Sequence, residues 1–399
     1  MGNSEQAAVH SYRIVFVNQF FWPDNAPTAI LLDQTARYAA SQGHEVMVIC
    51  GRHGYAAGGA SAPPAVRICR VPSFRFARNP VSRLLSWGSF LLLAALRLLW
   101  LERCDIVVVM TTPPGLSIAS ALLKRHLGAK LWIWEMDVYP DVVIATGGLA
   151  GSSLLARILQ RVFTWSRRRA DGIIALGECM QARLTASGVP ANRIHIAHNW
   201  ADDQQSFASV ALKSTPLRLL YSGNLGMAHE VETLCSVLLL LAAEKAVHFV
   251  FAGGGVARPG LEASCREAGA DNVTFQAYGD TQTFNENLRN CHLGLVTLRD
   301  GCQGTVVPSK VYSLLSAGRP ILFIGPKDAT PAILIREHQC GWQFDPGAAL
   351  EISSFLRSLS QNPYLAAEAG ARARRAFELH FTRSHGTERV LRTLLSCPC

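Results

Sequence analysis

The chain has few charged side chains, and fewer acidic than basic ones. Charged residues make up 17% of its 399 positions, and 38 lysines and arginines outnumber 29 aspartates and glutamates. The net charge of +9 suits an anionic partner, which could be a nucleic acid, a membrane surface or a phosphorylated substrate. No nucleic-acid-binding motif is present and aromatics are not interleaved with the basic residues, so we expect no nucleic-acid partner.

Long apolar runs are also lacking. The most hydrophobic segment, residues 84–101, contains Arg97 and is flanked by Arg83 and Arg103. A spanning helix needs about 20 apolar residues. We therefore expect a helix that packs on the sheet and presents one face to lipid, with a full membrane span as the less favoured alternative. Residues 1–12 are polar, so we expect no secretory signal.

Paired cysteines and metal-ligand motifs are absent. The eleven cysteines are scattered singly, which is typical of reduced residues in a cytosolic protein. Cys397 and Cys399 have no nearby His or Cys partner, and His195 and His198 have no companion ligands at a suitable spacing. We expect no metal site.

Buried strands alternate with helices along the whole chain. Strand 13–17, helix 29–41 and strand 46–50 form a first unit, and a strand at 217–221 starts the pattern again. Such units predict an α/β fold with doubly wound parallel sheets. The G-x-G-x-x-G fingerprint is missing at the first turn, which argues against a dehydrogenase.

The length suits two domains. We place an N-terminal domain at residues 1–200 and a C-terminal domain at 201–381, each Rossmann-like and facing a common cleft. The polar stretch 203–215 is the expected linker.

Residues 301–320 combine a glycine-containing loop, a short helix and a lysine in its first turn. Pro308 suits the start of a helix, and Gly318 suits its left-handed stop. Free N–H groups and the charge of Lys310 would form an anion site there. From the residues alone, a structural helix with a solvated lysine remains the alternative.

Glycines follow two strands of the second half. Gly223 and Gly226 flank Asn224, and this turn would let a phosphate approach a helix N-terminus closely. Gly253 and Gly254 end the next strand. The carboxyl ends of parallel strands face the ligand crevice in open α/β sheets.

Two features of the first half leave alternatives open. Asp137 follows a buried strand, where a carboxylate serves either function or a helix cap. The stretch Arg161–Arg169 holds four arginines with Phe163 and Trp165 between them. It predicts either a surface for anionic lipid or a solvated helix face.

Several motifs resemble those of glycosyltransferase family four, especially bacterial enzymes of exopolysaccharide, O-antigen and colanic-acid assembly. Residues 308–320, Pro-Ser-Lys-x-Tyr-x-x-Leu-x-Ala-Gly-Arg-Pro, resemble the segment under the nucleotide diphosphate of the donor. Residues 223–229 match a second donor motif. Residues 21–27 resemble the opening loop near the acceptor, 137–140 an Asp-x-x-Pro motif, and 199–202 the interdomain hinge.

The resemblance implies the GT-B fold, with residues 382–399 packing back on the first domain. It implies Lys310 and Asp137 as catalytic residues. The donor-binding residues that it implies are Gly223, Asn224, Leu225, Gly226, Gly253, Gly254, Tyr278, Arg299, Val307, Pro308, Ser309, Lys310 and Ser313. The acceptor-side residues are Pro23, Asp24, Asn25, Ala26, Asp137 and Tyr139.

The sequence departs from the family in the donor site. The family usually carries two glutamates where this chain has Thr305 and Ser313, so only a weaker contact from a hydroxyl to the ribose is implied. Many members carry an Arg and a Lys where this chain has Met227 and His229. The diphosphate would then be met by the lysine of the donor segment, backbone N–H groups, Arg299 or a protonated His229.

The resulting expectation is a retaining hexosyltransferase without cofactor or metal, because helix N-termini and Lys310 can stabilise the leaving diphosphate. Its donor would be a nucleoside-diphosphate sugar, with UDP-sugars favoured. Its acceptor would be a membrane-associated or lipid-linked glycan, and the protein would be cytoplasmic, peripheral on the inner face of the membrane. The alternatives are an inactive GT-B scaffold that binds sugar nucleotides or lipid, and a UDP-sugar epimerase.

Overall fold

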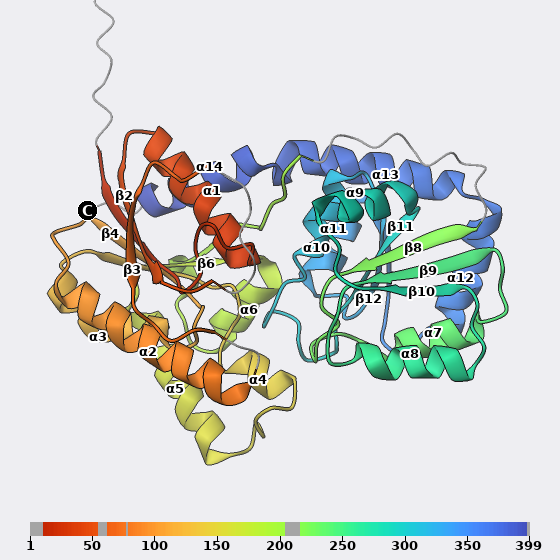
Figure 1. The fold of residues 1–399 in the computed structure, drawn as a ribbon, viewed down its shortest axis with the longest axis horizontal. Helices are drawn as coiled ribbons and strands as arrows, with labels where there is room; N and C mark the ends of the chain where they lie inside the picture. The colour runs from red at the N-terminus through yellow and green to blue at the C-terminus, as the bar shows by residue number, and fades with distance from the viewer. Residues whose placement is uncertain (1–10, 55–61, 77–78, 204–215, 397–399) are drawn as a thin grey trace, which may run out of the picture.

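The computed structural model describes residues 11–54, 62–76, 79–203 and 216–396 (Figure 1). They form two α/β domains side by side, each with a parallel sheet between helices. The predicted doubly wound α/β class is therefore confirmed. Residues 204–215 of the expected linker, the first ten residues, and Cys397 and Cys399 lie outside the described residues.

The first sheet has seven parallel strands in the order β3-β2-β1-β4-β5-β6-β7. Its central strands are apolar runs buried on both faces, as expected for a sheet covered by helices on each side. The strands are β1 (Arg13–Val17), β2 (Glu45–Gly51), β3 (Arg67–Val71), β4 (Ile106–Met110), β5 (Lys130–Trp134), β6 (Gly172–Ala175) and β7 (Ile194–Ile196).

Helices α2, α3 and α5 form a layer of the first domain, because α3 packs against both of the others. In α2 the buried residues Ser86, Phe90, Ala94 and Leu98 recur every four positions, so one stripe packs inward. The helices of this domain are α1 (Pro27–Ser41), α2 (Pro80–Leu99), α3 (Leu116–Leu127), α4 (Asp141–Ala145), α5 (Leu154–Arg169), α6 (Glu178–Ala186) and a short 3₁₀ helix (Ala191–Arg193).

Within the described residues, α2 is the one helix that has the length and apolar composition of a membrane span, and 22% of its most apolar window is buried. The buried stripe confirms that this helix packs on the domain, and the contact of its other face with lipid stays a prediction.

The second sheet has six parallel strands in the order β10-β9-β8-β11-β12-β13. The strands are β8 (Leu217–Ser222), β9 (Val247–Ala252), β10 (Val273–Gln276), β11 (Leu293–Thr297), β12 (Ile321–Ile324) and β13 (Gly341–Phe344). Its helices are α7 (Glu232–Leu240), α8 (Arg258–Glu267), α9 (Thr281–Asn290), α10 (Lys310–Ser316), α11 (Thr330–His338), α12 (Ala349–Gln361) and α13 (Tyr364–Ala376).

The chain returns to the first domain at its end. A π-helical turn (Phe377–Phe381) follows α13, and α14 (Arg383–Ser396) packs against α1. Leu391 and Leu394 of α14 join the hydrophobic core of the first domain. In Figure 1, α13 lies along the second domain and α14 along the first, so this segment links the two.

The strand order reverses between β1 and β4 in the first sheet and between β8 and β11 in the second. Ligands of open α/β sheets bind outside the carboxyl ends of the strands at such a reversal. A ligand site is therefore expected where the loops after β8, β9 and β11 meet the first domain.

Candidate functional site

The loops after β8 and β9 are joined by backbone hydrogen bonds. The Gly223 N–H donates to the Ala252 carbonyl over 2.9 Å, and the Leu225 N–H donates to the Gly254 carbonyl over 2.7 Å. A Cβ on Gly253 would lie 2.2 Å from the Gly223 carbonyl oxygen, and both glycines have a φ of +136°. Glycine alone allows this approach at this backbone angle. The two predicted turns, residues 223–226 and 253–254, therefore form one closely packed surface, which we call the glycine floor.

Lys310 lies against this floor. Its Nζ is 3.5 Å from the position of a Cβ on Gly223 and 3.5 Å from the centroid of the Tyr221 ring. Nζ is buried and has no hydrogen-bond partner among the described residues. Burial lowers the pKa of Lys310 well below its usual value, because the ammonium loses its hydration. A phosphate placed beside it would restore the lost stabilisation of the charged form.

Tyr278 and Arg299 lie beside the same floor. The ring of Tyr278 is 3.7 Å from the position of a Cβ on Gly254, and this side chain is 60% exposed. The Arg299 N–H donates to the Ala228 carbonyl over 2.8 Å, which fixes β11 to the turn after the first glycine loop. The structure thus gathers these two predicted donor residues, the glycines and Lys310 at one edge of the second sheet.

His229 does not supply positive charge, contrary to one of the expectations. Its Nδ1 donates to the Thr297 carbonyl over 2.9 Å. Burial, with the nearby Lys310, lowers the pKa of His229 to about 4. The ring is therefore neutral at pH 7, since protonation would place a second cation in the same buried region.

The predicted helix N-terminus directly after the first glycine turn is also wrong. Helix α7 begins at Glu232. The Glu230 carboxylate accepts hydrogen bonds of 2.9 Å from both the N–H and the hydroxyl of Thr233. Because the protein's own carboxylate caps this helix, a phosphate has no free helix N-terminus there.

The start of α10 differs from its prediction too. The helix begins at Lys310 with Ser309 as its N-cap, so the buried Pro308 precedes the helix. Gly318 has a φ of +65° and ends the helix as predicted. Val307 is partly buried against the hydrophobic core of the first domain.

The two positions that replace the family's glutamates behave differently. Thr305 is fully buried and its hydroxyl donates to the Cys302 carbonyl over 2.7 Å, so it cannot contact a ribose as proposed. Ser313 is half-buried on α10, and within the described residues its hydroxyl has no partner. Of the two hydroxyls, only that of Ser313 is free to meet a ligand.

The donor segment is hydrogen-bonded to the first domain. The Val138 N–H donates to the Thr305 carbonyl over 2.8 Å, and Asp137 pairs with Val306 in an antiparallel bridge. This short ladder joins the loop after β5 to the segment that carries Lys310. Asp137 therefore lies on backbone that is paired directly with the segment leading into Lys310.

Asp137 is the carboxylate at this junction. Burial, with the charge of Glu135, raises its pKa to about 6. The alternative of a helix cap is wrong, because α4 begins at Asp141 and has no side-chain cap. An ionised Asp137 can accept a hydrogen bond from an acceptor hydroxyl.

A buried ion pair supports the Asp137 loop. Arg167 Nε lies 2.6 Å from Glu135 Oε1, with 2% and 1% of the two side chains exposed. Arg167 Nη2 also donates to the Tyr139 carbonyl over 2.8 Å. Arg167 is therefore structural and does not belong to the predicted surface of four arginines. Tyr139 is half-buried, and burial and the nearby Asp137 raise its pKa.

The sequence did not identify Arg183, which holds the donor segment from α6. Its Nε donates to the Gln303 carbonyl over 2.9 Å and its Nη2 to the Gly301 carbonyl over 3.0 Å, while Nη1 lies 3.5 Å from Asp141. A Cβ on Gly304 would lie 2.4 Å from the Cys179 carbonyl oxygen, so the contact is close. No motif marks Arg183, because its partners are carbonyls 118 and 120 residues away.

Arg258 is a second residue that the sequence did not identify. It donates from Nη1 to the carbonyls of Gly253 and Gln276, and its guanidinium lies over the Phe275 ring. These contacts fix the loop after β9 from the start of α8.

The opening loop lies at another part of the first domain. Pro23, Asp24 and Asn25 line a hollow of about 790 Å³ together with residues of α1 and α14. The Asp24 carboxylate accepts from the Ala26 N–H over 2.9 Å, which shapes the loop. Ala26 and Asp24 are buried, whereas Pro23 and Asn25 are exposed. The acceptor-side role of these four residues stays a prediction.

The hinge motif is anchored to the returning tail. The Trp200 Nε1–H donates to Gln34 over 2.6 Å, and a Cβ on Gly386 would meet the Trp200 ring at 2.1 Å. Asp202 pairs with Arg383 over 2.6 Å.

Over the described part of the chain, no group of three or more His, Cys, Asp and Glu could hold a metal ion.

Comparison with known proteins agrees with the fold and the motifs. A family model described as "Glycosyl transferase 4-like domain" matches residues 29–200. The chain is 27% identical to "Probable glycosyltransferase WbjE" of Pseudomonas aeruginosa, over 72% of this chain and 75% of that protein. It is 25% identical to "Putative colanic acid biosynthesis glycosyl transferase WcaI" of Escherichia coli (strain K12), over 71% and 76%.

The solved structure of Anabaena Alr3699/HepE in complex with UDP-glucose superposes with a TM-score of 0.70 and 14% identity, covering 96% of this chain and all of that one. Two doubly wound domains joined in this way define the GT-B fold. The chain is a glycosyltransferase with the GT-B fold, and its residues 29–200 match the family-four-like model that the sequence motifs resemble.

Proposed function

We propose that the protein transfers a sugar from a nucleoside-diphosphate sugar, most favourably a UDP-sugar, to a lipid-linked or membrane-associated glycan of a bacterial polysaccharide. The colanic-acid role given in the name of WcaI supports the pathway, and the UDP-glucose bound by HepE supports the donor. The observation that carries the proposal is the buried, unpartnered Lys310 ammonium against the glycine floor.

The leaving group accounts for this arrangement. As the acceptor oxygen bonds to the anomeric carbon, the bond from that carbon to the phosphate oxygen breaks and its electrons pass to the nucleoside diphosphate. The charge of Lys310 stabilises this developing anion more than it stabilises the bound donor, which lowers the barrier. These residues supply the stabilisation without a metal ion.

Asp137 acts on the acceptor side in this proposal. Its ionised carboxylate orients the acceptor hydroxyl by accepting a hydrogen bond, and the leaving phosphate oxygen takes the proton. The nucleoside diphosphate thus leaves from the same face of the anomeric carbon to which the acceptor oxygen bonds, and the configuration is retained. The backbone bridge between Asp137 and Val306 sets the distance between the two sides.

The exposed face of α2 supports a peripheral contact with an anionic membrane. Val81, Leu84, Leu85, Leu92 and Leu96 are between 44% and 68% exposed on the side opposite the buried stripe. Arginines flank this face, and a surface that combines apolar and basic residues binds anionic lipid.

The transferase activity is tested by incubating the protein with UDP-sugars and a short lipid-diphosphate-linked glycan. We expect UDP release together with a product one sugar longer. Binding of a UDP-sugar without its consumption in the presence of acceptor would indicate the inactive scaffold, and conversion of the free UDP-sugar into its epimer would indicate the epimerase.

A further inference from the structure

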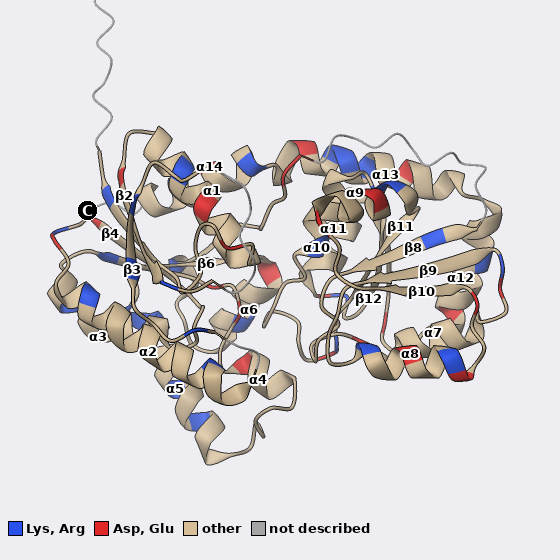
Figure 2. Cartoon of the chain, viewed as in Figure 1, with Lys and Arg blue, Asp and Glu red and all other residues tan. Residues whose placement is uncertain are grey.

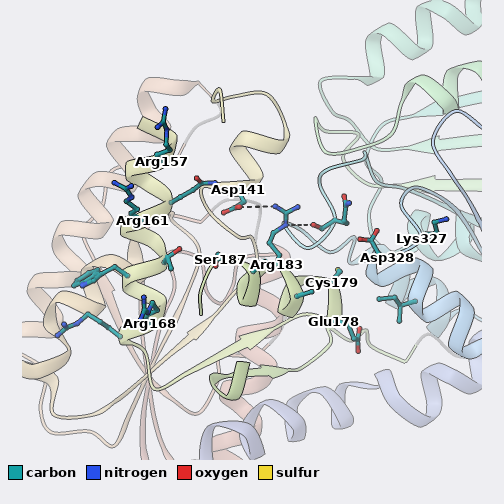
Figure 3. Close-up of a pocket in the computed structure, with 18 of the residues that line it drawn as sticks. Asp141, Arg157, Arg161, Arg168, Glu178, Cys179, Arg183, Ser187, Lys327 and Asp328 are labelled. Carbon is teal, nitrogen blue, oxygen red and sulfur yellow. Dashed lines mark hydrogen bonds and ion pairs between the residues drawn. The ribbon is translucent and has the colours of Figure 1, made fainter. Parts of the chain in front are cut away.

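A wide basic groove lies between the outer face of α5 and the loop before α11 (Figure 3). It has a volume of about 1430 Å³ and is lined by both domains. None of the glycines or Lys310 of the donor floor lines it. Its charged residues are seven basic and three acidic ones: Arg157, Arg161, Arg168, Arg169, Arg183, Lys327, Arg336, Asp141, Glu178 and Asp328.

Two of the three acidic side chains are already paired. Asp141 lies 3.5 Å from Arg183, and Glu178 lies 3.4 Å from His198. The side-chain hydrogen bond with His198 lowers the pKa of Glu178, so this carboxylate is ionised and engaged. Asp328 alone is left to face the remaining cations of the groove.

The basic side chains, by contrast, are mostly unpaired. Over the described residues, four of them make no side-chain hydrogen bond or ion pair: Arg161, Arg168, Lys327 and Arg336. Figure 3 shows Arg161 and Arg168 on α5 of the first domain, and Lys327 on the opposite side of the groove, in the second domain. Like charges gathered without a counter-charge repel one another, and guanidinium groups suit the oxygens of a phosphate.

Apolar side chains share the outer face of α5 with these arginines. Leu154, Ile158 and Trp165 are 69%, 46% and 38% exposed, at spacings that place them on one side of the helix. Basic residues recur along the same helix (Figure 2). A ligand that matches both properties carries phosphate and an apolar chain.

We propose that this groove binds the diphosphate of the lipid-linked acceptor, and that the exposed face of α5 contacts the first part of its lipid chain. The identity of the diphosphate carrier rests on the proposed function. Asp141 and Gln303 line the groove, and they lie close in sequence to Asp137 and Thr305 of the interdomain ladder. The groove therefore lies next to the backbone ladder that connects the Asp137 loop to the donor segment.

The experiment measures binding of farnesyl diphosphate to the full-length protein by calorimetry. The test variant is Arg161→Ala/Arg168→Ala. The matched control is Arg125→Ala/Arg375→Ala, which removes the same charge from two exposed arginines outside the groove. We expect the Kd to rise at least about tenfold in the test variant and less than about twofold in the control, with unchanged melting temperatures.

Three results would overturn the assignment. Equal losses in the two double variants would mean a general charge effect. Farnesol or inorganic pyrophosphate binding as tightly as farnesyl diphosphate would mean that the groove does not recognise a lipid diphosphate. Loss of binding to phosphatidylglycerol vesicles, with farnesyl diphosphate binding intact, would mean a membrane contact only.

A further variant separates this inference from the proposed function. Lys310→Ala is expected to lose UDP binding and to keep farnesyl diphosphate binding, and excess UDP should not displace farnesyl diphosphate from the wild type. If the wild type fails to bind UDP but binds farnesyl diphosphate through Arg161 and Arg168, the proposed donor fails while the groove stands. If excess UDP displaced farnesyl diphosphate from the wild type, the two ligands would share a site, and the assignment of the groove to the acceptor diphosphate would be wrong.

Discussion

The two domains share one fold but differ in what their strand ends carry. In the second domain, the ends of β8 and β9 carry glycines whose backbones approach so closely that a Cβ on Gly253 would lie 2.2 Å from a carbonyl oxygen. In the first domain, the ends of β1 and β5 lead into polar loops that contain Asp24 and Asp137. Bare backbone suits a phosphate group, whereas side-chain carboxylates suit sugar hydroxyls.

The outer surfaces of the domains differ as well. The layer of α2, α3 and α5 exposes a row of large apolar side chains together with unpaired arginines. Under the proposed function, the second domain would hold a small phosphorylated donor and the first an amphiphilic acceptor. Each prediction below tests one side of this contrast.

The largest expected effect follows from Lys310→Ala. Removing the buried ammonium at the glycine floor should lower kcat/KM by about 10²–10³-fold, the range seen for a lost group that stabilises transition-state charge. UDP release in the presence of acceptor measures it. Lys245→Ala, at an exposed turn of the same domain, should have normal activity. Normal turnover in Lys310→Ala would remove the role of this lysine.

Gly253→Ala tests the glycine floor itself. The added Cβ meets the Gly223 carbonyl oxygen at a φ of +136°, so we expect a loss of about 1–3 kcal/mol in the free energy of unfolding and weaker UDP binding. The control Gly260→Ala, inside α8 with no atom within 4 Å, should instead gain up to about 1 kcal/mol. Urea denaturation distinguishes them, and equal stabilities of the two variants would argue against a tight floor.

Arg183→Ala tests the link between the domains. The variant loses two hydrogen bonds to the carbonyls of Gln303 and Gly301, so we expect kcat/KM to fall by about tenfold. Arg183→Lys should restore only part of it, because an ammonium cannot reproduce the planar fork. Steady-state kinetics with varied donor should show the loss mainly in the donor KM, with an unchanged pH profile. A shifted pH profile would contradict a positioning role.

Lowering the pH should reduce kcat/KM by protonating Asp137. The pKa of Asp137 is raised to about 6, so its carboxylate is ionised above that pH and protonated below it. We expect kcat/KM to fall about tenfold per pH unit below about 6. Asp137→Asn should be slower and lack this limb. An unchanged acid limb in that variant would assign it to another group.

The smallest effect concerns the membrane face. Leu92→Glu/Leu96→Glu places charge on the exposed side of α2, and we expect binding to phosphatidylglycerol vesicles to weaken by a few fold, since several other apolar residues remain. Leu350→Glu, on an exposed leucine of α12, is the control. Co-sedimentation measures both, and the same loss in the control would rule out a contact specific to α2.

Most of the fold could be predicted because its strands are apolar runs buried on both faces. β3 was missed because residues Arg67–Val71 form an edge strand that is half exposed and lacks such a run. The start of α7 was placed too early, because the cap formed by Glu230 depends on which way a side chain turns.

Site residues could be predicted from the sequence only where a short motif of neighbouring residues marks them. Glycine turns and the lysine of the donor segment are marked in the sequence, and the structure brings them together. No motif marks Arg183 or the basic groove, because each depends on contacts between the two domains. The neutral state of His229 likewise follows from burial beside Lys310, which spacing does not show.

Thermal melting with and without UDP tests the central claim most directly. UDP at 100 times its Kd should stabilise the wild type by about 2.7 kcal/mol, and it should not shift the melting temperature of Lys310→Ala. An equal shift in both proteins would contradict the role of Lys310, and the absence of any shift in the wild type would contradict the donor site.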